Sequence, residues 1–322
     1  MSGAQILVQC LKEQGVDTIF GYPGGQVIHI YDALYDSDIK HILTRHEQGA
    51  IHAADGYARA TGKVGVCLVT SGPGATNLVT GIANAYMDSV PLVAITGQVP
   101  TSLLGRDTFQ EVDITGITLP VTKHNYLVKD VSELGRIMKE AFHIARTGRP
   151  GPVLVDLPSD LSKAYTEYDP GVKMDLPGYR PMRSATEEQL NQAARCIMES
   201  QQPVIYAGGG IVNAGAHKEL LQLAEMLAAP VASTLMGMGG FPGDHPLFLG
   251  MLGMHGRDVY KRQVCESKKA VGRTRAGICE GGCGSSEKDV LAKGYRQPVK
   301  NAFQQRKAFF CINNADKVLY DE

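Results

Sequence analysis

Two neighbouring segments decide the fold of this chain, Thr44-Arg45-His46-Glu47-Gln48-Gly49-Ala50 and Ala53-Ala54-Asp55-Gly56-Tyr57-Ala58-Arg59. The apolar run 41–43 before them predicts a short strand, and their small residues predict a helix that ends at Gly62. Glu47 therefore stands where a strand ends and a helix begins. A carboxylate in that position can simply favour the helix dipole, or, if it is half-buried, it can handle protons.

Short apolar strands alternate with helices on both sides of these segments. The pattern predicts strands at 18–20, 64–70, 92–96 and 153–157. Helices are predicted at 1–15, with Ser2 as N-cap and Gly15 just past the end, and at about 26–34. The nearly continuous apolar runs are typical of a parallel sheet that is covered on both faces. We therefore expect an α/β fold with a doubly wound parallel sheet over residues 1–164.

The chain then changes character twice. Residues 165–183 are rich in proline and glycine and are predicted to be a linker. Residues 184–256 predict part of a second α/β domain, with strands at 203–207 and 230–234, a helix at about 213–227, and a capping box formed by Ser184 and Glu187. Residues 257–322 show neither a clear period nor a strand comparable to 64–70, so this tail is left unassigned.

Composition narrows the possible partners and compartments. The formal net charge of the 322 residues is −1, which gives no reason to expect nucleic acid or an anionic membrane. The sequence contains no apolar run of membrane-spanning length and no secretory signal pattern. The seven cysteines do not form a secreted disulfide framework. We therefore expect a cytoplasmic protein.

The glycine loop Gly21-Tyr22-Pro23-Gly24-Gly25, Glu47 and the loop 71–77 together resemble the pyrimidine-binding domain of thiamine diphosphate enzymes. In that family a glutamate hydrogen-bonds the cofactor's aminopyrimidine ring and promotes its reactive tautomer. The resemblance assigns this role to Glu47 and counts Gly25 among the catalytic residues. For the glycine loops, a purely structural role as strand-to-helix turns is the alternative. The resemblance predicts further cofactor contacts from the two loops: Gly24, Gly25, Pro73 and Asn77.

Phe109-Gln110-Glu111 and the segment 119–124 make the resemblance narrower, because they are similar to the large catalytic subunits of acetolactate (acetohydroxyacid) synthases. In that subfamily the amide that matches Gln110 lies near a substrate-derived carbonyl oxygen, where an amide donor suits a developing oxyanion. Pro100 and Phe109 fall in segments that line the family's substrate channel. We count Gln110 as a catalytic residue on this resemblance.

Several segments also resemble parts of these synthases that contact flavin adenine dinucleotide (FAD). Arg149 precedes a predicted buried strand, and the glycine run 208–210 has the spacing G-x-G-x-x-N, which departs from the dinucleotide fingerprint. The family's order of segments, rather than any one of them, supports the prediction. The FAD contacts implied are Arg149, Gly208, Gly209, Gly210, Thr234, Leu235, Met236, Leu252, Gly253, Met254 and His255.

The resemblance implies decarboxylation of pyruvate and transfer of the two-carbon unit to a second pyruvate or to 2-ketobutyrate. It also implies a structural FAD, a homodimer formed through the pyrimidine-binding domain, and a small regulatory subunit. The family binds Mg²⁺ through a Gly-Asp-Gly motif, and this sequence contains none. We therefore expect the chain to hold no metal ligands, to represent a fragment, and to be inactive alone.

Two hypotheses remain open for residues 257–322. The segment 258–263 resembles one reading frame of a transposon-end sequencing adapter, which predicts unrelated or frame-shifted sequence after Gly256. The alternative is a native extension whose cysteines bind zinc, but the spacing C-x13-C-x3-C-x27-C lacks paired knuckles. For function, the alternatives are a non-catalytic FAD-binding or dimerisation module, or another thiamine-diphosphate-dependent carboligase or oxidase.

Overall fold

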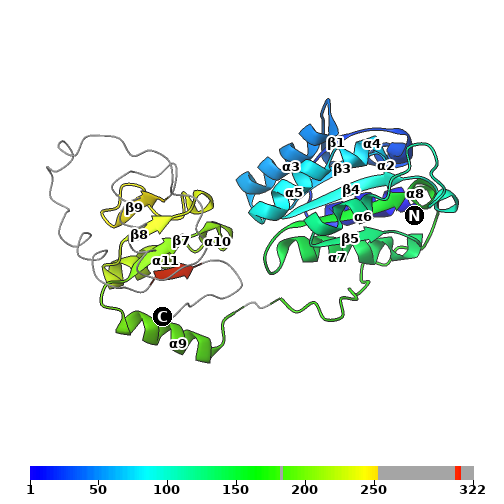
Figure 1. Ribbon diagram of the computed structural model, residues 1–322. Coiled ribbons are helices and arrows are strands. Elements are labelled where there is room, and N and C mark those ends of the chain that lie inside the picture. The colour runs from blue at the N-terminus through cyan, green and yellow to red at the C-terminus, as the bar shows by residue number, and fades with distance from the viewer. Residues whose placement is uncertain (182–183, 253–308, 313–322) are drawn as a thin grey trace. The chain divides into compact units, whose positions relative to one another are not determined.

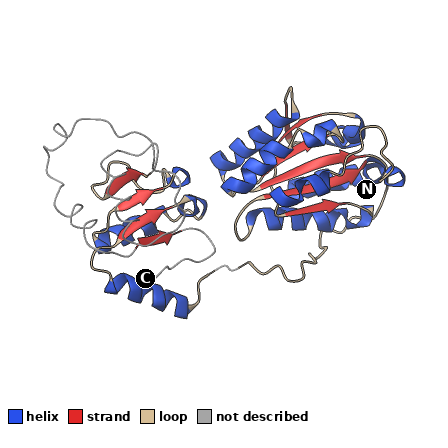
Figure 2. Cartoon of the chain, viewed as in Figure 1, coloured by secondary structure: helices blue, strands red, loops and turns tan. Residues whose placement is uncertain are grey.

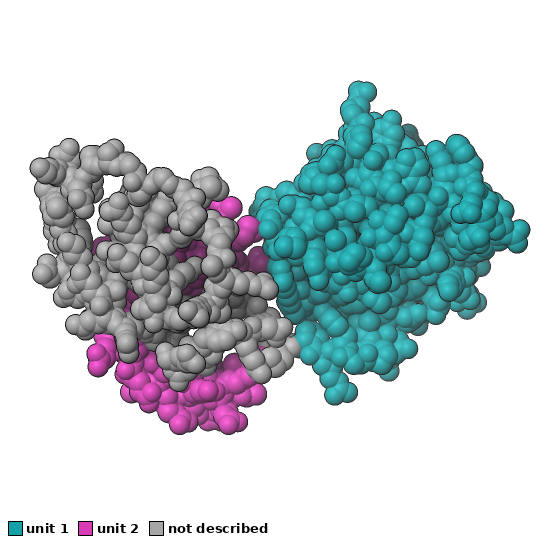
Figure 3. All heavy atoms as spheres, in the orientation of Figure 1, with its two compact units in different colours: residues 1–181 teal, residues 182–322 magenta. Residues whose placement is uncertain are grey.

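The computed structural model describes residues 1–181 and 184–252 and the backbone of 309–312. The chain divides into two compact units, residues 1–181 and 182–322 (Figure 3). The boundary between the units falls inside the predicted linker 165–183. Within the described residues, no helix is long and apolar enough to cross a membrane.

Unit 1 is built around a sheet of six parallel strands in the order β2-β1-β3-β4-β6-β5 (Figures 1 and 2). The strands are β1 (Thr18–Tyr22), β2 (Lys40–Leu43), β3 (Gly65–Val69), β4 (Leu92–Gln98), β5 (His124–Leu127) and β6 (Pro152–Pro158). The helices are α1 (Gly3–Glu13), α2 (Ile28–Tyr35), α3 (Glu47–Thr61), α4 (Pro73–Thr76), α5 (Val79–Asp88), α6 (Ile114–Thr118), α7 (Leu134–Arg146) and α8 (Ser159–Lys163). The prediction of a doubly wound α/β fold is confirmed.

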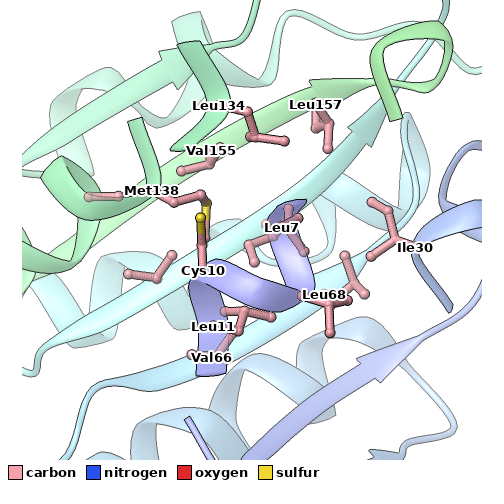
Figure 4. Close-up of a cluster of buried hydrophobic side chains, with 14 of the residues drawn as sticks. Leu7, Cys10, Leu11, Ile30, Val66, Leu68, Leu134, Met138, Val155 and Leu157 are labelled. Carbon is pink, nitrogen blue, oxygen red and sulfur yellow. The ribbon is translucent and has the colours of Figure 1, made fainter. Parts of the chain in front are cut away.

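Alternation along the central strands divides the core of unit 1 into two layers. In β3, Val66 and Leu68 belong to the cluster under α1, α2 and α7, whereas Cys67 and Val69 belong to the cluster under α3 and α5. Figure 4 shows the first cluster, in which side chains of α1 and α7 meet those of β3 and β6. Both faces of the sheet are therefore covered, and its central strands β3, β4 and β6 are buried along their whole length.

The ends of two helices confirm the predicted signals. Ser2 caps α1, its hydroxyl accepting from the Gln5 N–H while the Gln5 side chain accepts from the Ser2 N–H. Gly62 ends α3 in the left-handed conformation, with φ +71°. Glycine takes this conformation without the steric cost that a Cβ imposes. Helix α3, which begins at Glu47, is thus delimited at its far end by its own sequence.

Unit 2 contains a smaller parallel sheet in the order β10-β7-β8-β9. Its strands are β7 (Val204–Ala207), β8 (Val231–Ser233), β9 (Phe248–Met251) and β10 (Phe309–Ile312). Its helices are α9 (Glu187–Glu199), α10 (Gly209–Asn213) and α11 (His217–Leu227). A separate apolar cluster on β7, β8, α10 and α11 includes Ile205, Leu220 and Val231.

Three expectations for this part of the chain are wrong. The capping box of α9 is made by Thr186 and Gln189, two residues beyond the predicted pair. The helix expected from about 213 to 227 begins only at His217, because the preceding helix α10 ends at Asn213 and Gly215 adopts φ +64° between the two. The tail 257–322 was not expected to continue this α/β domain, yet 309–312 pairs with β7. That apolar run is only four residues long, too short for its pattern to stand out.

Candidate functional site

The candidate site of unit 1 lies at the carboxyl edge of its sheet. Because all six strands are parallel, the segments that follow them gather at the same edge. Gly24 follows β1, Glu47 follows β2, Pro73 follows β3, and Gln110 lies in the long connection after β4. The fold therefore brings to one edge the residues that the sequence proposed from separate motifs.

Glu47 is the first residue of α3 and is partly buried. His46 precedes it as N-cap, where Nδ1 accepts a hydrogen bond from the Gln48 N–H at 3.1 Å. The Asn77 side chain, at the end of α4, donates from Nδ2 to Glu47 Oε2 at 2.9 Å. One carboxylate oxygen is thus fixed by the loop after β3, and Oε1 faces Gly74.

Small residues leave space around this carboxylate. A Cβ added at Gly74 would stand 3.4 Å from Glu47 Oε1 and 2.8 Å from the Thr70 methyl carbon. A Cβ at Gly24 would stand 2.5 Å from the Thr70 side chain. Thr70 thus lies between the two glycine loops, and its hydroxyl accepts from the Gln26 N–H at 3.3 Å. Any larger residue at Gly24 or Gly74 would displace Thr70 and narrow the edge of the site.

Thr70 was not among the residues selected from sequence. The signal that could have found it is its position, since it is the first polar residue after the apolar strand β3. Gly25, by contrast, is exposed, and nothing lies within 4 Å of where its Cβ would be. Pro73 is the first residue of α4, also exposed. These two predicted cofactor contacts therefore present open surface at the site.

Gln110 reaches the site through its backbone. A Cβ at Gly72 would lie 2.7 Å from the Gln110 carbonyl oxygen and 2.9 Å from its Cα, so only glycine permits this contact. Gln110 itself has φ +58° and Gly72 has φ +57°. A non-glycine residue in this left-handed region is uncommon and calls for support from its surroundings.

Two buried polar side chains lie beneath the loop that carries Gln110. The Asp156 carboxylate accepts from the Thr96 hydroxyl at 2.7 Å and from Gln98 Nε2 at 3.0 Å. Burial raises the pKa of Asp156 to about 7. Sequence analysis missed both Asp156 and Gln98. The available signal was a lone carboxylate inside the apolar strand 152–158.

The remaining predicted residues of unit 1 lie in the connection after β4 and in the segment before β6. Pro100 begins the short 3-10 helix after β4, and Phe109, in the same connection, is 86% exposed. Arg149 precedes β6, at the amino edge of the sheet, where its guanidinium donates to Ser89 Oγ at 2.7 Å and to the Met87 carbonyl at 3.0 Å. Arg149 is therefore at the opposite edge of the sheet from the site.

The predicted FAD segments of unit 2 gather in the same way at the carboxyl edge of the second sheet. Gly208 follows β7, Thr234 follows β8 and Leu252 follows β9. The Thr234 hydroxyl accepts from the Gly237 N–H at 3.0 Å. Gly209 lies against Met236, because a Cβ added at Gly209 would stand 3.0 Å from the Met236 Cβ. Gly209 and Gly210 are the first two residues of helix α10, with Gly208 as N-cap, and Leu235 is exposed. Gly253, Met254 and His255 lie outside the described residues.

The hydrogen-bonding groups at this edge of the sheet fit an organic cofactor. In the part of the chain that the structure describes, no cluster of three His, Cys, Asp or Glu side chains could hold a metal. The edge offers instead a carboxylate held by an amide, flanked by glycine turns. Ser71, fully buried in the same loop, has a hydroxyl without a hydrogen-bond partner. These features fit a flat ring whose edge carries hydrogen-bonding groups and whose faces pack against the glycine turns.

Comparison with known sequences agrees with this geometry. The chain matches the family description "Thiamine pyrophosphate enzyme, N-terminal TPP binding domain" over residues 1–117 and "Thiamine pyrophosphate enzyme, central domain" over residues 190–267. Thiamine pyrophosphate is another name for thiamine diphosphate. The second match extends eleven residues beyond Gly256, to residue 267.

Curated relatives are similar over most of the chain. It is 55% identical over 269 residues to the "Probable acetolactate synthase large subunit" of Methanocaldococcus jannaschii, covering 83% of this chain and 46% of the relative. It is 58% identical over 266 residues to "Acetolactate synthase" of Arthrospira platensis, covering 80% and 46%. It is 55% identical over 257 residues to the "Acetolactate synthase large subunit" of Corynebacterium glutamicum, covering 80% of this chain and 41% of the relative.

The chain thus spans less than half the length of these relatives. Its two matched segments are the N-terminal and central domains, in that order, and the predicted glutamate lies in the first of them. The chain is similar to acetolactate synthase large subunits and belongs to the thiamine pyrophosphate enzymes.

Proposed function

We propose that this chain carries the pyrimidine-binding and central domains of an acetolactate synthase large subunit. The reaction would decarboxylate pyruvate and join the two-carbon unit to a second pyruvate or to 2-ketobutyrate, in the synthesis of valine, leucine and isoleucine. The observation that carries the proposal is the Glu47 carboxylate, which Asn77 holds at the glycine-lined edge of the sheet. The names of the sequence relatives support the choice of reaction.

Glu47 is the residue that would manage a proton in this reaction. Its Oε2 is occupied by the Asn77 amide, which leaves Oε1, facing Gly74, as the oxygen that holds and releases the proton. When bound, thiamine diphosphate supplies the carbon nucleophile and stabilises the charge left by decarboxylation. Gly24 and Gly25 would pass close to the reacting centre, and Pro73 would border the aminopyrimidine ring.

Gln110 would supply an amide donor for the oxygen of the substrate carbonyl. A fixed donor aimed at developing negative charge stabilises the transition state more than the ground state. Phe109, in the same loop and 86% exposed, and Pro100, at the start of that connection, would line the path of the second 2-keto acid. The exposed position of Phe109 leaves it available to such a substrate.

Further cofactors and partners are part of the proposal. FAD would contact the loops after β7, β8 and β9, together with Arg149, and would serve a structural role. Mg²⁺ would bind the diphosphate through ligands outside this chain's sequence, which has no Gly-Asp-Gly. We also propose a homodimer through the pyrimidine-binding domain, association with a small regulatory subunit, and a cytoplasmic location, which the free thiols of Cys10, Cys67 and Cys196 support.

The experiment that tests the function joins residues 1–252 to the remaining C-terminal part of the Methanocaldococcus jannaschii relative. We expect the fusion to form acetolactate from pyruvate, and the 322-residue polypeptide alone to form none. Glu47→Gln in the fusion should lower kcat by roughly 10²–10⁴-fold, the usual contribution of a positioned acid or base. Flavin absorbance without turnover in the fusion would favour the non-catalytic module instead.

A matched control separates proton transfer from a helix-dipole effect. Glu187 also begins a helix, α9, as a first-turn carboxylate, but it lies in the second unit. Glu187→Gln should leave acetolactate formation within about twofold of the parent fusion, because a surface dipole interaction is small. Equal losses for the two variants would contradict the role assigned to Glu47.

A further inference from the structure

The loop after β4 has no regular secondary structure around Gln110, yet a buried side chain of the sheet hydrogen-bonds to its backbone. Gln98, the last residue of β4, is 3% exposed, and Asp156, on the neighbouring strand β6, is 1% exposed. Both lie among apolar side chains that fill the rest of these strands. Buried polar groups are costly unless they are paired, so their retention here calls for an explanation.

Hydrogen bonds fix which way the Gln98 amide points. Its Oε1 accepts from the N–H of Val99 at 2.9 Å, so Nε2 must face the other way. Nε2 then donates to Asp156 Oδ2 at 3.0 Å and to the Val112 carbonyl at 2.8 Å. Both amide protons and the amide oxygen are thereby used. A flipped amide would place an oxygen against a carboxylate and a carbonyl, which is unfavourable.

The Val112 carbonyl is the point at which this pair meets the loop. Val112 lies two residues after Gln110, whose left-handed backbone abuts Gly72. Between them, Glu111 closes the turn by accepting from the Thr108 N–H at 2.9 Å. A short, closed turn bound at Val112 and seated on Gly72 has little freedom at Gln110.

We propose that Asp156 and Gln98 form a buried positioning pair that holds Gln110 at the height above the Gly72 loop where its amide can reach the substrate. Asp156 orients the Gln98 amide, and Gln98 binds the loop. The role of the pair in catalysis rests on the proposed function, because Gln110 has a substrate only if the protein carries out that reaction. The mechanical part of the proposal, that the pair immobilises 108–112, does not depend on it.

Two variants change the pair in different ways: one keeps its hydrogen bonds and the other removes them. Asp156→Asn keeps an oxygen that can accept from Gln98, and its new amide can donate to the Thr96 hydroxyl, so the loop should stay bound. Gln98→Met has a similar length but no hydrogen-bonding amide, so it releases Val112. We therefore expect Asp156→Asn to leave the loop bound and Gln98→Met to release it.

Hydrogen exchange followed by mass spectrometry on the full 322-residue chain measures the first effect. In Gln98→Met, amides of 108–112 should exchange roughly tenfold faster or more, because loss of a buried hydrogen bond favours local opening. Trypsin should cut after the exposed Arg106, the one Lys or Arg between 101 and 112, faster by a similar factor. Amides of α7 should keep the wild-type exchange rate, which shows that the unit is still folded.

Glu140→Gln is the matched control. Glu140, on α7, is another carboxylate with 1% exposure, but it accepts hydrogen bonds from Arg136, Tyr126 and the Asp175 N–H instead of binding Gln98. It should leave exchange in 108–112 unchanged, as should Asp156→Asn. Unchanged exchange and cleavage of this loop in a folded Gln98→Met protein would overturn the proposal, as would equal acceleration in the Glu140 control.

The fusion enzyme connects the pair to the reaction. There, Gln98→Met should lower kcat/KM for pyruvate by about tenfold or more, while Asp156→Asn retains most of it. If the parent fusion forms no acetolactate, the proposed function fails, but the exchange experiment still decides whether the pair holds the loop. Full activity of a Gln98→Met fusion whose loop is mobile would overturn the positioning role.

Discussion

Asp156 is a single carboxyl group within a strand of apolar residues, and its ionisation should be measurable in the stability of unit 1. Burial is the main cause that raises its pKa to about 7; the negative charge of Asp113 adds to the rise, whereas hydrogen bonds from Thr96 and Gln98 oppose it. In the unfolded chain the same group titrates near 4. Between these two values, the folded state binds one more proton than the unfolded state.

The free energy of unfolding should therefore fall as the pH rises from about 4 to about 7. Ionisation of Asp156 lowers the free energy of unfolding by up to about 1.4 kcal/mol per pH unit in this window. This loss is absent below the window and complete above it. Asp156→Asn removes the titration, so its stability relative to the wild type should increase with pH. Urea unfolding of residues 1–181 at pH 4.5, 5.5, 6.5 and 7.5 measures this, and a constant difference between the two proteins would contradict it.

Residues at the site differed in how far sequence could place them. Glu47 was predictable because the apolar run 41–43 before it and the small-residue stretch that ends at Gly62 after it mark the end of a strand and the start of a helix. Thr70, Gln98 and Asp156 were not, because their roles depend on neighbours distant in the chain: Thr70 touches Gly24, and Asp156 meets Gln98 across 58 residues. A pattern read along one strand does not contain the register between strands.

At the scale of elements, helix α3 is the part that positions Glu47, and close backbone contacts set its place. A Cβ at Gly65 would lie 2.2 Å from the Ala54 carbonyl oxygen, and one at Gly81 would lie 2.2 Å from the Ile51 side chain. The helix therefore lies unusually close to both β3 and α5. Asp55 adds polar fixation, accepting from Arg59 at 2.6 Å and from Asn84 on α5 at 2.6 Å.

Two glycine substitutions at these helices should have opposite signs. Gly81→Ala forces Ile51 to move in a filled core and should lower the free energy of unfolding by about 1–3 kcal/mol. Gly56→Ala, on the exposed side of α3 with nothing within 4 Å, should raise it by about 0.5–1 kcal/mol through helix propensity. Urea unfolding of the two variants makes the comparison. A stabilising Gly81→Ala would show that the helices are not in this contact.

Elements were predicted well where one signal dominated. The apolar runs placed β3, β4 and β6 to within two residues at each end, and Ser2 and Gly62 marked the ends of helices. Strand β5, with the sequence His124-Asn125-Tyr126-Leu127, was not predicted, because as an edge strand it is only partly buried and mostly polar. Segments that depend on tertiary contacts rather than local pattern were the ones that sequence missed.

At the scale of the whole molecule, the predicted linker 165–183 is fastened to unit 1 over most of its length. The Tyr168 hydroxyl donates to Glu13 at 2.8 Å, and the Asp175 N–H donates to the buried Glu140 at 2.7 Å. Lys123, whose pKa burial lowers to about 8, donates to Tyr179 at 3.2 Å. Although they are irregular, residues 165–181 therefore belong to the folded structure of unit 1.

A fragment that ends at residue 181 should consequently fold better than one that ends at the predicted domain boundary, 164. The shorter fragment loses the contacts of Tyr168, Asp175 and Tyr179, each worth about 1 kcal/mol, and exposes apolar surface on α7. We expect its free energy of unfolding to be lower by about 3 kcal/mol or more. Urea unfolding monitored by circular dichroism of both fragments gives the difference.

Single substitutions within residues 1–181 show whether the packed segment or merely chain length is responsible. Tyr168→Phe removes the hydroxyl that joins the segment to α1 and should cost about 1 kcal/mol, the usual net value of one intramolecular hydrogen bond. Tyr165→Phe is its control, because Tyr165 is 79% exposed and should leave stability unchanged. If the two fragments are equally stable and Tyr168→Phe is neutral, then 165–181 is a linker, as its proline and glycine content first indicated, and unit 1 is complete at residue 164.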